Sequence, residues 1–359
     1  WTPIGNVSVE FTGSYNGLGS TIDGLVIDRS GTSWVGLFGR INGATIENLG
    51  VTNVTITGAY FTGGLAALNA SSTISNSYTT GSVTGVESVG GLVGWNSSST
   101  TITCYSTATV TGTSEVGGLV GYNQSSSTIS NSYSTGAVTR SSGTEVSFGS
   151  FCGHNDGSTI QKSYATGAVA YTGTTDPTDK GFVGSETPTT TYANNLFDSE
   201  TSVQSTGTGA TAKTTVQMQT ESTFTDAGWD FEGETTNGTN DYWDISGAYP
   251  FVYSPEGTED HPARITSLAD LISLSGTSAD WGKYFIQTAD IDASSTSALN
   301  SGAGFLPIGS VSPYFTGAYN GLGYTIDALF INRPSTTYVG LFGYTNVATI
   351  KNLGMTNVD

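Results

Sequence analysis

One short motif recurs along this chain, and its spacing constrains the fold more than any other feature. Residues 89–96 read Val-Gly-Gly-Leu-Val-Gly-Trp-Asn, and residues 116–123 repeat this sequence with Tyr in place of Trp. Looser copies lie on both sides, and the apolar anchors of the whole series are Leu37, Leu65, Leu92, Leu119, Phe151 and Phe182. Successive anchors are 28, 27, 27, 32 and 31 residues apart. Self-similarity at a period of roughly 20–50 residues is typical of stacked-repeat architectures, so the spacing predicts a solenoid.

The composition makes this solenoid an all-β one. Glycine accounts for 49 of the 359 residues, roughly twice its usual share, and a chain so rich in Gly, Ser, Thr and Asn disfavours long helices. Short runs of Val, Ile and Leu, with 18 Tyr and 15 Phe, supply side chains that can be buried. We therefore expect a β-helix, or β-solenoid, that is right-handed, has coils of about 27 residues, and carries a short helical cap at the start of each cassette.

The repeats predict which side chains share a column. Each repeat reads as three short strands: the Gly-Gly-Leu-Val-Gly run, a second run such as residues 73–78, and a third such as residues 81–85. Stacked coils lie ~4.8 Å apart, so equivalent residues sit directly above one another. One predicted structural column consists of Leu37, Leu65, Leu92, Leu119 and Phe151, and another of Tyr78, Tyr105, Tyr133 and Tyr164.

The two ends of the chain are related to each other. Residues 1–55 align without a gap with residues 305–359, and most aligned positions are identical. We therefore expect a segment of a larger tandem protein, in which residues 1–256 are the C-terminal part of one β-helical cassette. Within that part, residues 1–189 form coils and residues 190–256 form a closing segment. Residues 257–264 are then a linker, and residues 265–359 are the cap and first coils of the next cassette.

Local signals support these boundaries. The aromatic runs at 228–231, 242–245 and 249–251 are expected to cover the open end of the last coil. Ser267, with Asp270 three residues later, is a plausible N-cap for a short apolar helix that Gly276 would end. Near the start, residues 16–19 (Asn-Gly-Leu-Gly) predict a turn between two strands.

The repeated Gly-Gly-Leu-Val-Gly-Xaa-Asn at residues 90–96 and 117–123 resembles the GLUG motif of large bacterial and archaeal surface proteins. Residues 74–78 and 81–85 resemble the usual continuation of that motif. Residues 65–68 (Leu-Ala-Ala-Leu) and the pair Phe151 and Cys152 depart from it, which puts the regularity of those coils in doubt. The resemblance implies an extracellular β-helical adhesin or surface-fibre protein, and it brings no catalytic residues.

Charge and chemistry exclude several classes of function. Ten Lys and Arg residues against 29 Asp and Glu give a formal net charge of −19, which repels nucleic acid and anionic membranes. We expect no nucleic-acid partner and no membrane insertion of this segment. The two histidines, His154 and His261, have no carboxylate or thiol at ligand spacing to both, and nothing in the sequence indicates a catalytic triad, so we expect no catalytic site, no cofactor and no enzymatic activity. Cys104 and Cys152 are interpreted as small buried hydrophobes.

Two weaker signals leave alternatives open. The acidic residues Asp230, Glu232, Asp241 and Asp244 either form a solvated face or hold Ca²⁺ at a cassette junction. Asn69, Asn96 and Asn123 follow the first strand of successive repeats and also begin Asn-Xaa-Ser sequons. They either hydrogen-bond up a column as stacked amides or carry glycans in a source that glycosylates secreted proteins.

The sequence thus favours a structural or adhesive module, located outside the cell or on its surface, that builds a rod or filament from β-helical cassettes joined end to end. Its partners would be other cassettes of the same protein or filament. The alternative is a carbohydrate- or partner-binding face on the same rod, using exposed aromatic residues such as Trp95 and Tyr122 to recognise host, surface or matrix glycans.

Overall fold

The computed structural model describes residues 1–245, 248–252, 257–259 and 262–358. The chain divides into two compact units, Trp1–Ser254 and Pro255–Asp359. The predicted boundary at residue 256 lies close to this division but outside the described residues. The predicted linker, 257–264, is not wholly a linker, because Ala263–Ile265 forms a strand of the second unit. Residues 260 and 261 of that linker also lie outside the described residues.

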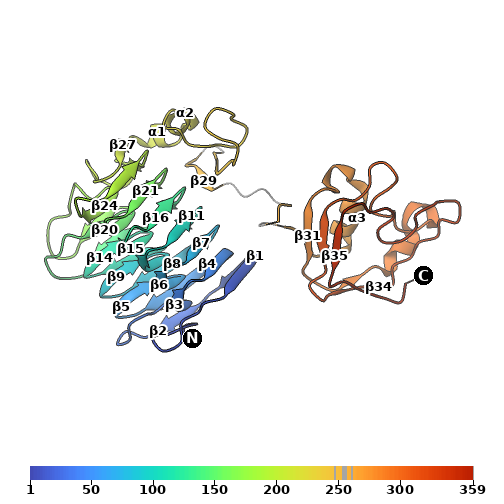
Figure 1. Ribbon diagram of the computed structural model, residues 1–359, viewed down its shortest axis with the longest axis horizontal. Coiled ribbons are helices and arrows are strands. Elements are labelled where there is room, and N and C mark those ends of the chain that lie inside the picture. The colour runs from blue at the N-terminus through green and yellow to red at the C-terminus, as the bar shows by residue number, and fades with distance from the viewer. Residues whose placement is uncertain (246–247, 253–256, 260–261, 359) are drawn as a thin grey trace. The chain divides into compact units, whose positions relative to one another are not determined.

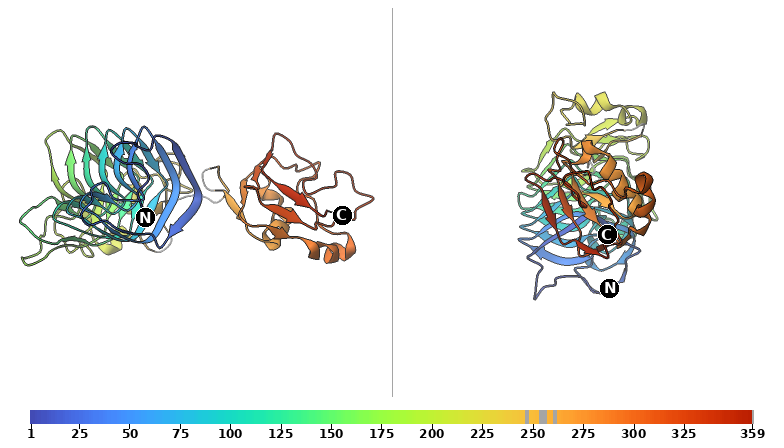
Figure 2. Two further views of the ribbon diagram at one scale, coloured as in Figure 1. Left: turned by 90° about the horizontal axis from the view of Figure 1, so that it is seen from below. Right: turned by 90° about the vertical axis from the view of Figure 1, so that its right-hand side faces the viewer.

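The first unit is a β-solenoid, in which strands of successive coils pair in parallel and each repeat adds one layer (Figures 1 and 2). The predicted all-β solenoid fold is confirmed. Sheet A contains β3 (Phe38–Asn42), β6 (Ala66–Ala70), β10 (Val93–Ser97), β15 (Val120–Gln124), β20 (Cys152–Asp156) and β24 (Val183–Glu186). Sheet C contains β5 (Tyr60–Gly63), β9 (Glu87–Gly90), β14 (Ser114–Gly117) and β19 (Phe148–Gly149).

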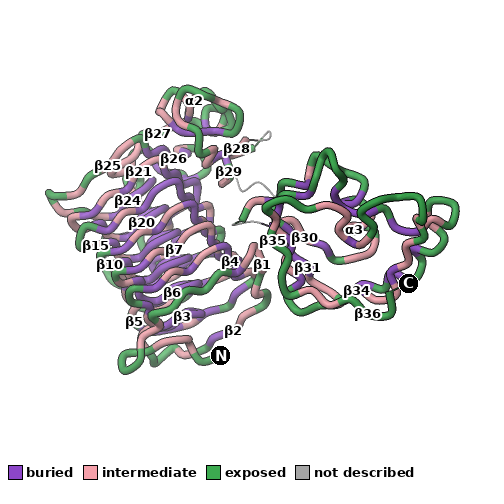
Figure 3. Tube along the Cα trace, turned by 45° about the vertical axis from the view of Figure 1, so that its right-hand side comes forward, coloured by how far each residue is buried: buried purple, intermediate pink, exposed green. Residues whose placement is uncertain are grey.

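The remaining strands of the solenoid form a larger, strongly bent sheet, sheet B. It begins with β1 (Ser14–Asp23), β2 (Val26–Asp28), β4 (Thr45–Thr57), β7 (Thr73–Ser75), β8 (Tyr78–Thr84), β11 (Thr100–Ile102), β12 (Tyr105–Ser106) and β13 (Thr109–Gly112). It continues with β16 (Thr128–Ser130), β17 (Tyr133–Ser134), β18 (Val138–Arg140), β21 (Thr159–Gln161), β22 (Tyr164–Ala165) and β23 (Val169–Tyr171), and ends with β25 (Thr191–Ala193), β26 (Leu196–Asp198) and β27 (Thr211–Lys213). Apolar residues alternate with polar ones along these strands, which places the apolar set inside the coils (Figure 3).

The recurrent motif is a corner and not the single strand that we predicted. In the coil of residues 87–112, β9 ends at Gly90, β10 begins at Val93, and Gly91 and Leu92 make the bend between sheets C and A. A Cβ on Gly90 would clash with the carbonyl of Val93 and lie 2.7 Å from the amide nitrogen of Gly121 in the next coil. The motif glycines are therefore required because backbone from two coils crosses there.

Each coil also contains more strands than the three we predicted. The coil of residues 87–112 is divided into β9, β10, β11, β12 and β13. Ser98 and Thr103 interrupt it with left-handed backbone, at φ of 52° and 51°. A left-handed residue turns the chain sharply, so these positions make corners that hydrophobic patterning alone does not reveal.

The coils of unequal length keep their register. Leu119 and Phe151 are 32 residues apart, yet β15 still pairs with β20 through Val120 and Cys152. Residues 141–146 are exposed and take up the extra length. Residues 66–68 also stay in register with the coil above, because Ala66 pairs with Val93 and Leu68 with Trp95. The departures from the motif therefore leave the coils regular.

The predicted turn at residues 16–19 is instead an irregularity inside a strand. β1 runs through it from Ser14 to Asp23 and pairs with β4 on both sides, with a register shift between Asn16 and Ser20. The side-chain oxygen of Asn16 accepts the amide of Leu18 at 2.7 Å, and Leu18 has a left-handed φ of 50°. This local bond gives the backbone an alternative to the ladder, so the strand bulges and continues.

Residues 199–210 cover the open end of the solenoid, a role that we predicted for the aromatic closing segment. Gly207 and Thr208 bridge Lys180 and Val183 in antiparallel fashion. The buried Gln204 accepts the amide of Lys180 at 2.9 Å and donates to the carbonyl of Pro177 at 3.0 Å. This loop therefore satisfies backbone groups of the last coil that would otherwise remain unpaired.

The closing segment follows with α1 (Thr215–Met218), α2 (Glu221–Thr225) and the antiparallel pair β28 (Trp243–Asp244) and β29 (Phe251–Val252). A capping box at Thr214 and Gln217 starts α1. The helices lie near the last coils (Figure 1). Their aromatic cluster, however, packs against the outward-facing Tyr133 and Tyr164 and not against the interior of the coils. The prediction that these aromatics close the open end was therefore wrong.

The second unit has two parallel sheets, a helical segment and its own core. One sheet contains β30 (Ala263–Ile265), β31 (Tyr284–Gln287), β33 (Ala318–Asn320) and β35 (Thr349–Lys351), and the other contains β32 (Ile291–Asp292), β34 (Thr325–Asp327) and β36 (Gly354–Thr356). Its helices are α3 (Leu268–Gly276) and the 3₁₀ segments η1 (Ser278–Asp280) and η2 (Ser294–Gly302). As predicted, the Ser267 side chain caps α3 by accepting the amide of Asp270, and the helix ends at Gly276.

Hydrogen bonds of the first coil of the first unit recur in the second unit at an offset of 304 residues. The amide of Ile4 donates to Leu37 and that of Ile308 to Leu341, both at 2.9 Å. Asn53 donates to Asp23, and Asn357 donates to Asp327, both at 2.7 Å. The sequence repeat is therefore also a structural repeat. Within the described residues, no helix is long and apolar enough to cross a membrane.

Candidate functional site

The anchor residues of the motif form one inward column. Leu37, Leu65, Leu92, Leu119 and Phe151 are all buried. The amide of Leu92 donates to the carbonyl of Leu119 at 2.9 Å, and the amide of Leu65 donates to Leu92 at the same distance. Leu92 and Leu119 are thus next-door neighbours, as the predicted column requires. Phe151 extends the column by stacking on Phe182, with ring centroids 4.6 Å apart.

The tyrosine column lies on the outside of the solenoid. Tyr78, Tyr105, Tyr133 and Tyr164 stack with centroids 4.5, 4.7 and 5.0 Å apart and with planes within 7° of parallel. The closing segment covers the upper part of this stack, where Tyr133 is 8% and Tyr164 1% exposed. The Tyr164 hydroxyl donates to the carbonyl of Pro250 at 2.6 Å. The column therefore serves as the docking face of the closing segment.

Buried amides form a second inward column. Asn69 donates to Asn96, Asn96 to Asn123 and Asn123 to Asn155, at 2.7, 2.8 and 2.8 Å. The first three of these residues are the predicted sequon asparagines, and each is fully buried. A glycan needs an amide that reaches solvent, so burial argues against glycosylation of Asn69, Asn96 and Asn123 in the folded coil. Their hydrogen bonding matches the stacked-amide alternative.

Serine hydroxyls also connect successive coils, because they accept hydrogen bonds from backbone amides at the corners. The amides of Ser72, Ser99 and Ser127 each donate to the hydroxyl of the serine one coil above, at 3.1 Å. A second column of this kind contains Cys104, whose amide donates to the Ser132 hydroxyl at 3.1 Å. Both cysteines are free and buried, and burial raises the pKa of the Cys104 thiol to about 12. Cys104 therefore occupies a serine position in a polar ladder, a role that the sequence did not suggest.

A further column, which we did not predict, runs along the outer surface. Trp34 stacks on Phe61 at 4.2 Å, Phe61 on Trp95 at 5.1 Å, and Trp95 on Tyr122 at 6.0 Å between centroids. The guanidinium of Arg40 lies 4.6 Å from the Trp34 ring centroid. Trp34 and Phe61 occupy one position of the coil and Trp95 and Tyr122 another, so no single register aligns them. Inspection of the sequence for a column at one register therefore could not reveal this stack.

The stacking limits which faces of these rings a ligand can contact. Trp95 lies between Phe61 and Tyr122, with interplanar angles of 26° and 16°. Trp95 is half-buried, and both neighbouring rings lie close to parallel with it. A sugar stacks on the face of an aromatic ring, so these neighbouring rings would compete with it, and glycan binding by Trp95 and Tyr122 stays a prediction.

Polar side chains gather near the last rings of this stack. His154 Nδ1 lies 2.6 Å from the Ser185 hydroxyl, which donates to Ser147, and Ser147 donates to Glu145. The serine protons are directed toward the carboxylate and not toward the imidazole, so the chain of bonds does not activate a nucleophile. Glu115 accepts a hydrogen bond from Ser88, and burial raises the pKa of its carboxyl above the ordinary value.

The four acidic residues considered for Ca²⁺ do not gather into one site. Asp230 is buried, and its Oδ2 accepts the amide of Asn240 at 3.0 Å, which fixes the local loop. Glu232 is exposed, and Asp241 and Asp244 are partly exposed. In the parts of the chain that the structure describes, no three His, Cys, Asp or Glu side chains are grouped to hold a metal ion. Calcium binding here stays a prediction without a formed site.

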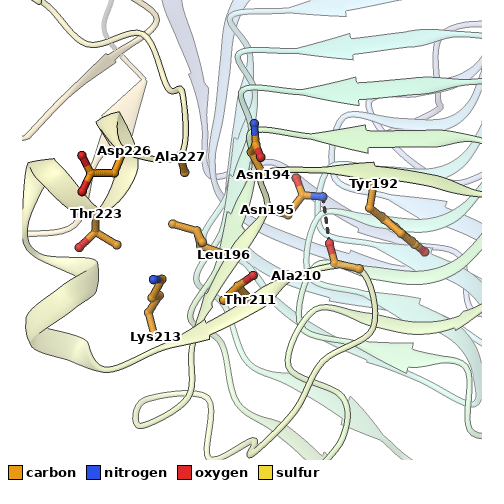
Figure 4. A pocket seen from close by; sticks show the side chains of 11 residues that line it. Tyr192, Asn194, Asn195, Leu196, Ala210, Thr211, Lys213, Thr223, Asp226 and Ala227 are labelled. Atoms are coloured by element: carbon orange, nitrogen blue, oxygen red, sulfur yellow. Dashed lines mark hydrogen bonds between the residues drawn. The ribbon is translucent and has the colours of Figure 1, made fainter. Parts of the chain in front are cut away.

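A pocket of about 450 Å³ lies between the last coil and the closing segment (Figure 4). One wall comes from β25, β26 and β27, and the other from α2 and the turn after it. Leu196, Ala210 and Ala227 are its apolar lining. The polar lining consists of Asn194, Asn195, Thr211, Lys213, Thr223 and Asp226. The sequence did not predict that these residues come together, because they become neighbours only when the closing segment folds back.

Comparison with known proteins agrees with the repeat. Residues 112–139 match the family model described as the GLUG motif. A stretch of 104 residues, 28% of this chain, is 41% identical to halomucin of Haloquadratum walsbyi and covers 1% of that protein. A stretch of 103 residues, again 28% of the chain, is 37% identical to a protein of Evansella cellulosilytica described as a Gly-rich membrane protein, and covers 12% of it. No solved structure matches the chain.

Proposed function

We propose that this chain is a structural repeat module of a protein located outside the cell or on its surface, in which β-solenoid cassettes joined end to end form a rod. The observation that carries this proposal is the continuity of the columns. Apolar, amide, serine and aromatic columns pass from coil to coil in the first unit, and the bonds of its first coil recur in the second unit. Such contacts between neighbouring layers hold solenoids together. The function of the chain would then be structural: to build and lengthen the rod.

The comparisons support a surface location only through the relatives. One of them is described as a Gly-rich membrane protein, and the matched stretch covers only 1% and 12% of the two relatives. A module that fills a small fraction of a long chain is what a tandem architecture requires. The proposal assigns no catalytic activity and needs no cofactor.

Small-angle X-ray scattering would test the rod. A polypeptide in which Trp1–Ser254 and Pro255–Asp359 are followed by a second identical copy should keep the same cross-sectional radius as the single chain, while its maximum dimension increases by a fixed step. A rise in the cross-sectional radius, or a scattering curve typical of a flexible string of compact bodies, would contradict a rod of stacked cassettes. Location is a separate question, which labelling of intact cells with antibodies against the chain would answer.

A further inference from the structure

We infer that the pocket between β27 and α2 is a binding site for a neutral saccharide, a function that the proposed rod does not require. Its walls are held in place without a ligand. The indole nitrogen of Trp229 donates to the carbonyl of Asn194 at 2.8 Å. Phe224 of α2 is fully buried and packs edge-to-face on Trp229, with centroids 4.9 Å apart. The hollow is therefore a preformed feature of the first unit.

The polar side chains around the pocket differ from those of the coils. In the coils, buried polar side chains such as Asn96 and Ser99 bond to the next layer. Asn195 follows the same rule, because it donates to Ile160 and Gly209 and accepts from Ser163. By contrast, the side chains of Asn194, Thr211, Lys213, Thr223 and Asp226 make no hydrogen bond or ion pair with any described residue. Asn194, Thr211 and Asp226 are exposed, and Lys213 and Thr223 are half-buried, so a ligand in the pocket can reach those of the five that are not directed outward.

The direction of these side chains indicates the chemistry of the ligand. Figure 4 shows the Lys213 amine directed into the gap between β27 and α2, with Leu196 directed into the same gap and the Asp226 carboxylate directed outward from α2. A small apolar lining suits the C–H face of a pyranose ring. The amine, the hydroxyls and the amide suit its ring hydroxyls, which both donate and accept.

Charge distinguishes a neutral sugar from an acidic one. The chain carries a formal net charge of −19, and Asp226 lies on the rim of the pocket. An acidic sugar would meet both the overall field and this carboxylate, and the single amine of Lys213 does not offset them. A neutral sugar avoids this repulsion.

Titration of the ¹⁵N-labelled full chain by NMR would test the site, with methyl glucoside, methyl galactoside, methyl mannoside and galacturonic acid as the probes. We expect at least one neutral probe to shift amides at 194–196, 209–213 and 223–227, with an affinity on the order of millimolar because the groove is open. Lys213→Met should weaken that affinity by about tenfold or more. Lys351→Met, an exposed lysine of the second unit, is the matched control and should leave it unchanged.

Three other outcomes would overturn the proposed saccharide site. Absence of pocket shifts with every neutral probe would remove the site, and shifts with galacturonic acid alone would contradict the neutral class. An unchanged affinity of Lys213→Met, with the far-ultraviolet circular dichroism of the parent chain, would exclude the pocket as the place of binding. None of these results would bear on the rod, which small-angle scattering tests separately.

Discussion

Individual polar side chains carry much of the axial contact in this solenoid. The amides of Asn69, Asn96 and Asn123 sit inside the coils, where water cannot satisfy them, and each donates to the amide of the next layer. Asn155 ends the column by donating to the carbonyl of Ser158 at 3.4 Å. Because every step depends on its neighbour, loss of one member leaves partners unsatisfied on both sides.

Replacement of a middle asparagine should therefore be costly. Asn96→Leu keeps the size of the side chain but leaves the Asn69 donor and the Asn123 acceptor without partners. We expect the free energy of unfolding, measured by urea titration, to fall by about 2–5 kcal/mol. Thr55→Leu, at an exposed position of β4, is the control and should change it by less than about 0.5 kcal/mol. Equal effects of the two substitutions would refute a role for the amide column.

Glu115 should destabilise the fold as the pH rises. Burial raises the pKa of its carboxyl, so the unfolded chain releases this proton at a lower pH than the folded chain does. Stability is then fully present below the unfolded pKa of about 4.5 and is lost as the pH rises through the folded pKa. Glu115→Gln should melt at the parent temperature in acid and above it at neutral pH. An identical difference at both pH values would contradict this expectation.

Glu145, on the same side of the coil, should affect stability with the opposite dependence on pH. Its pKa is lowered, chiefly because it accepts the backbone amide of Val146. Its contribution to stability is present above the unfolded pKa and is lost as the pH falls through the folded pKa. Glu145→Gln should therefore lose melting temperature at neutral pH and match the parent chain in acid, as a control of opposite sign for Glu115→Gln.

For individual residues, the sequence predicted the columns whose members recur at one position of the coil. Leu92 with Leu119, and Tyr105 with Tyr133, could be paired by counting residues. Counting could not reveal that the tyrosines point outward, because a period alone does not say which face is buried. Nor could it find the stack of Trp34, Phe61 and Trp95, because Trp95 occupies a different position of the coil from Trp34 and Phe61.

Among the structural elements, the glycine-rich corner formed by the repeated motif determines whether a coil can close. Gly90, Gly91 and Gly94 each face backbone of the same coil or of an adjacent one. A Cβ on Gly94 would lie 2.8 Å from both the Ala67 carbonyl and the Thr62 amide nitrogen. Real Cβ atoms do not approach backbone so closely, so the corner would have to open to admit a side chain.

A single methyl group at this corner should therefore be costly. Gly90→Ala would force the chain away from Val93 and Gly121, and we expect the free energy of unfolding to fall by more than about 2 kcal/mol. Gly31→Ala is the matched control, because nothing lies within 4 Å of its added Cβ, and it should be within about 0.5 kcal/mol of the parent chain. Chemical denaturation followed by circular dichroism measures both. A tolerated Gly90→Ala would contradict the close packing of the corner.

Sequence patterns predicted the strands of the repeated coils better than the segments that cover the end of the solenoid. The spacing of the motif gave the coils and their parallel stacking. The closing elements do not repeat, so period and pattern could not assign their contacts. The aromatic runs at 228–231 and 242–245 indicated burial but not the surface that they bury. Residues 199–210, rich in Ser, Thr and Gly, contain no repeat motif or apolar run, yet they seal the last coil. For α3, local capping chemistry at Ser267 was sufficient.

For the whole molecule, charge opposes compaction. The formal net charge is −19, and the ion pairs found among the described residues are Arg40 with Glu10, Lys180 with Asp179, and Lys283 with Asp280. Most acidic side chains therefore repel one another without a nearby cation, and dissolved salt should screen that repulsion.

Stability should consequently rise with ionic strength. We expect the melting temperature, followed by differential scanning calorimetry, to increase between roughly 0.01 M and 0.5 M NaCl as the screening length shortens from about 30 Å to a few ångströms. Replacing NaCl with an equal concentration of glycerol, an uncharged solute that is not a sugar, is the control for general solvent effects. A melting temperature that falls as NaCl is added would show that ion pairs outweigh repulsion, contrary to this account.

Successive coils of the solenoid lie in register, so that side chains one repeat apart touch along the axis. Nuclear Overhauser effects between methyl groups of selectively labelled leucines test this register most directly. We expect cross-peaks between Leu65 and Leu92 and between Leu92 and Leu119, and none between Leu65 and Leu119. Absence of the first two, or a cross-peak between Leu65 and Leu119 of equal strength, would contradict the stacked solenoid and the function proposed from it.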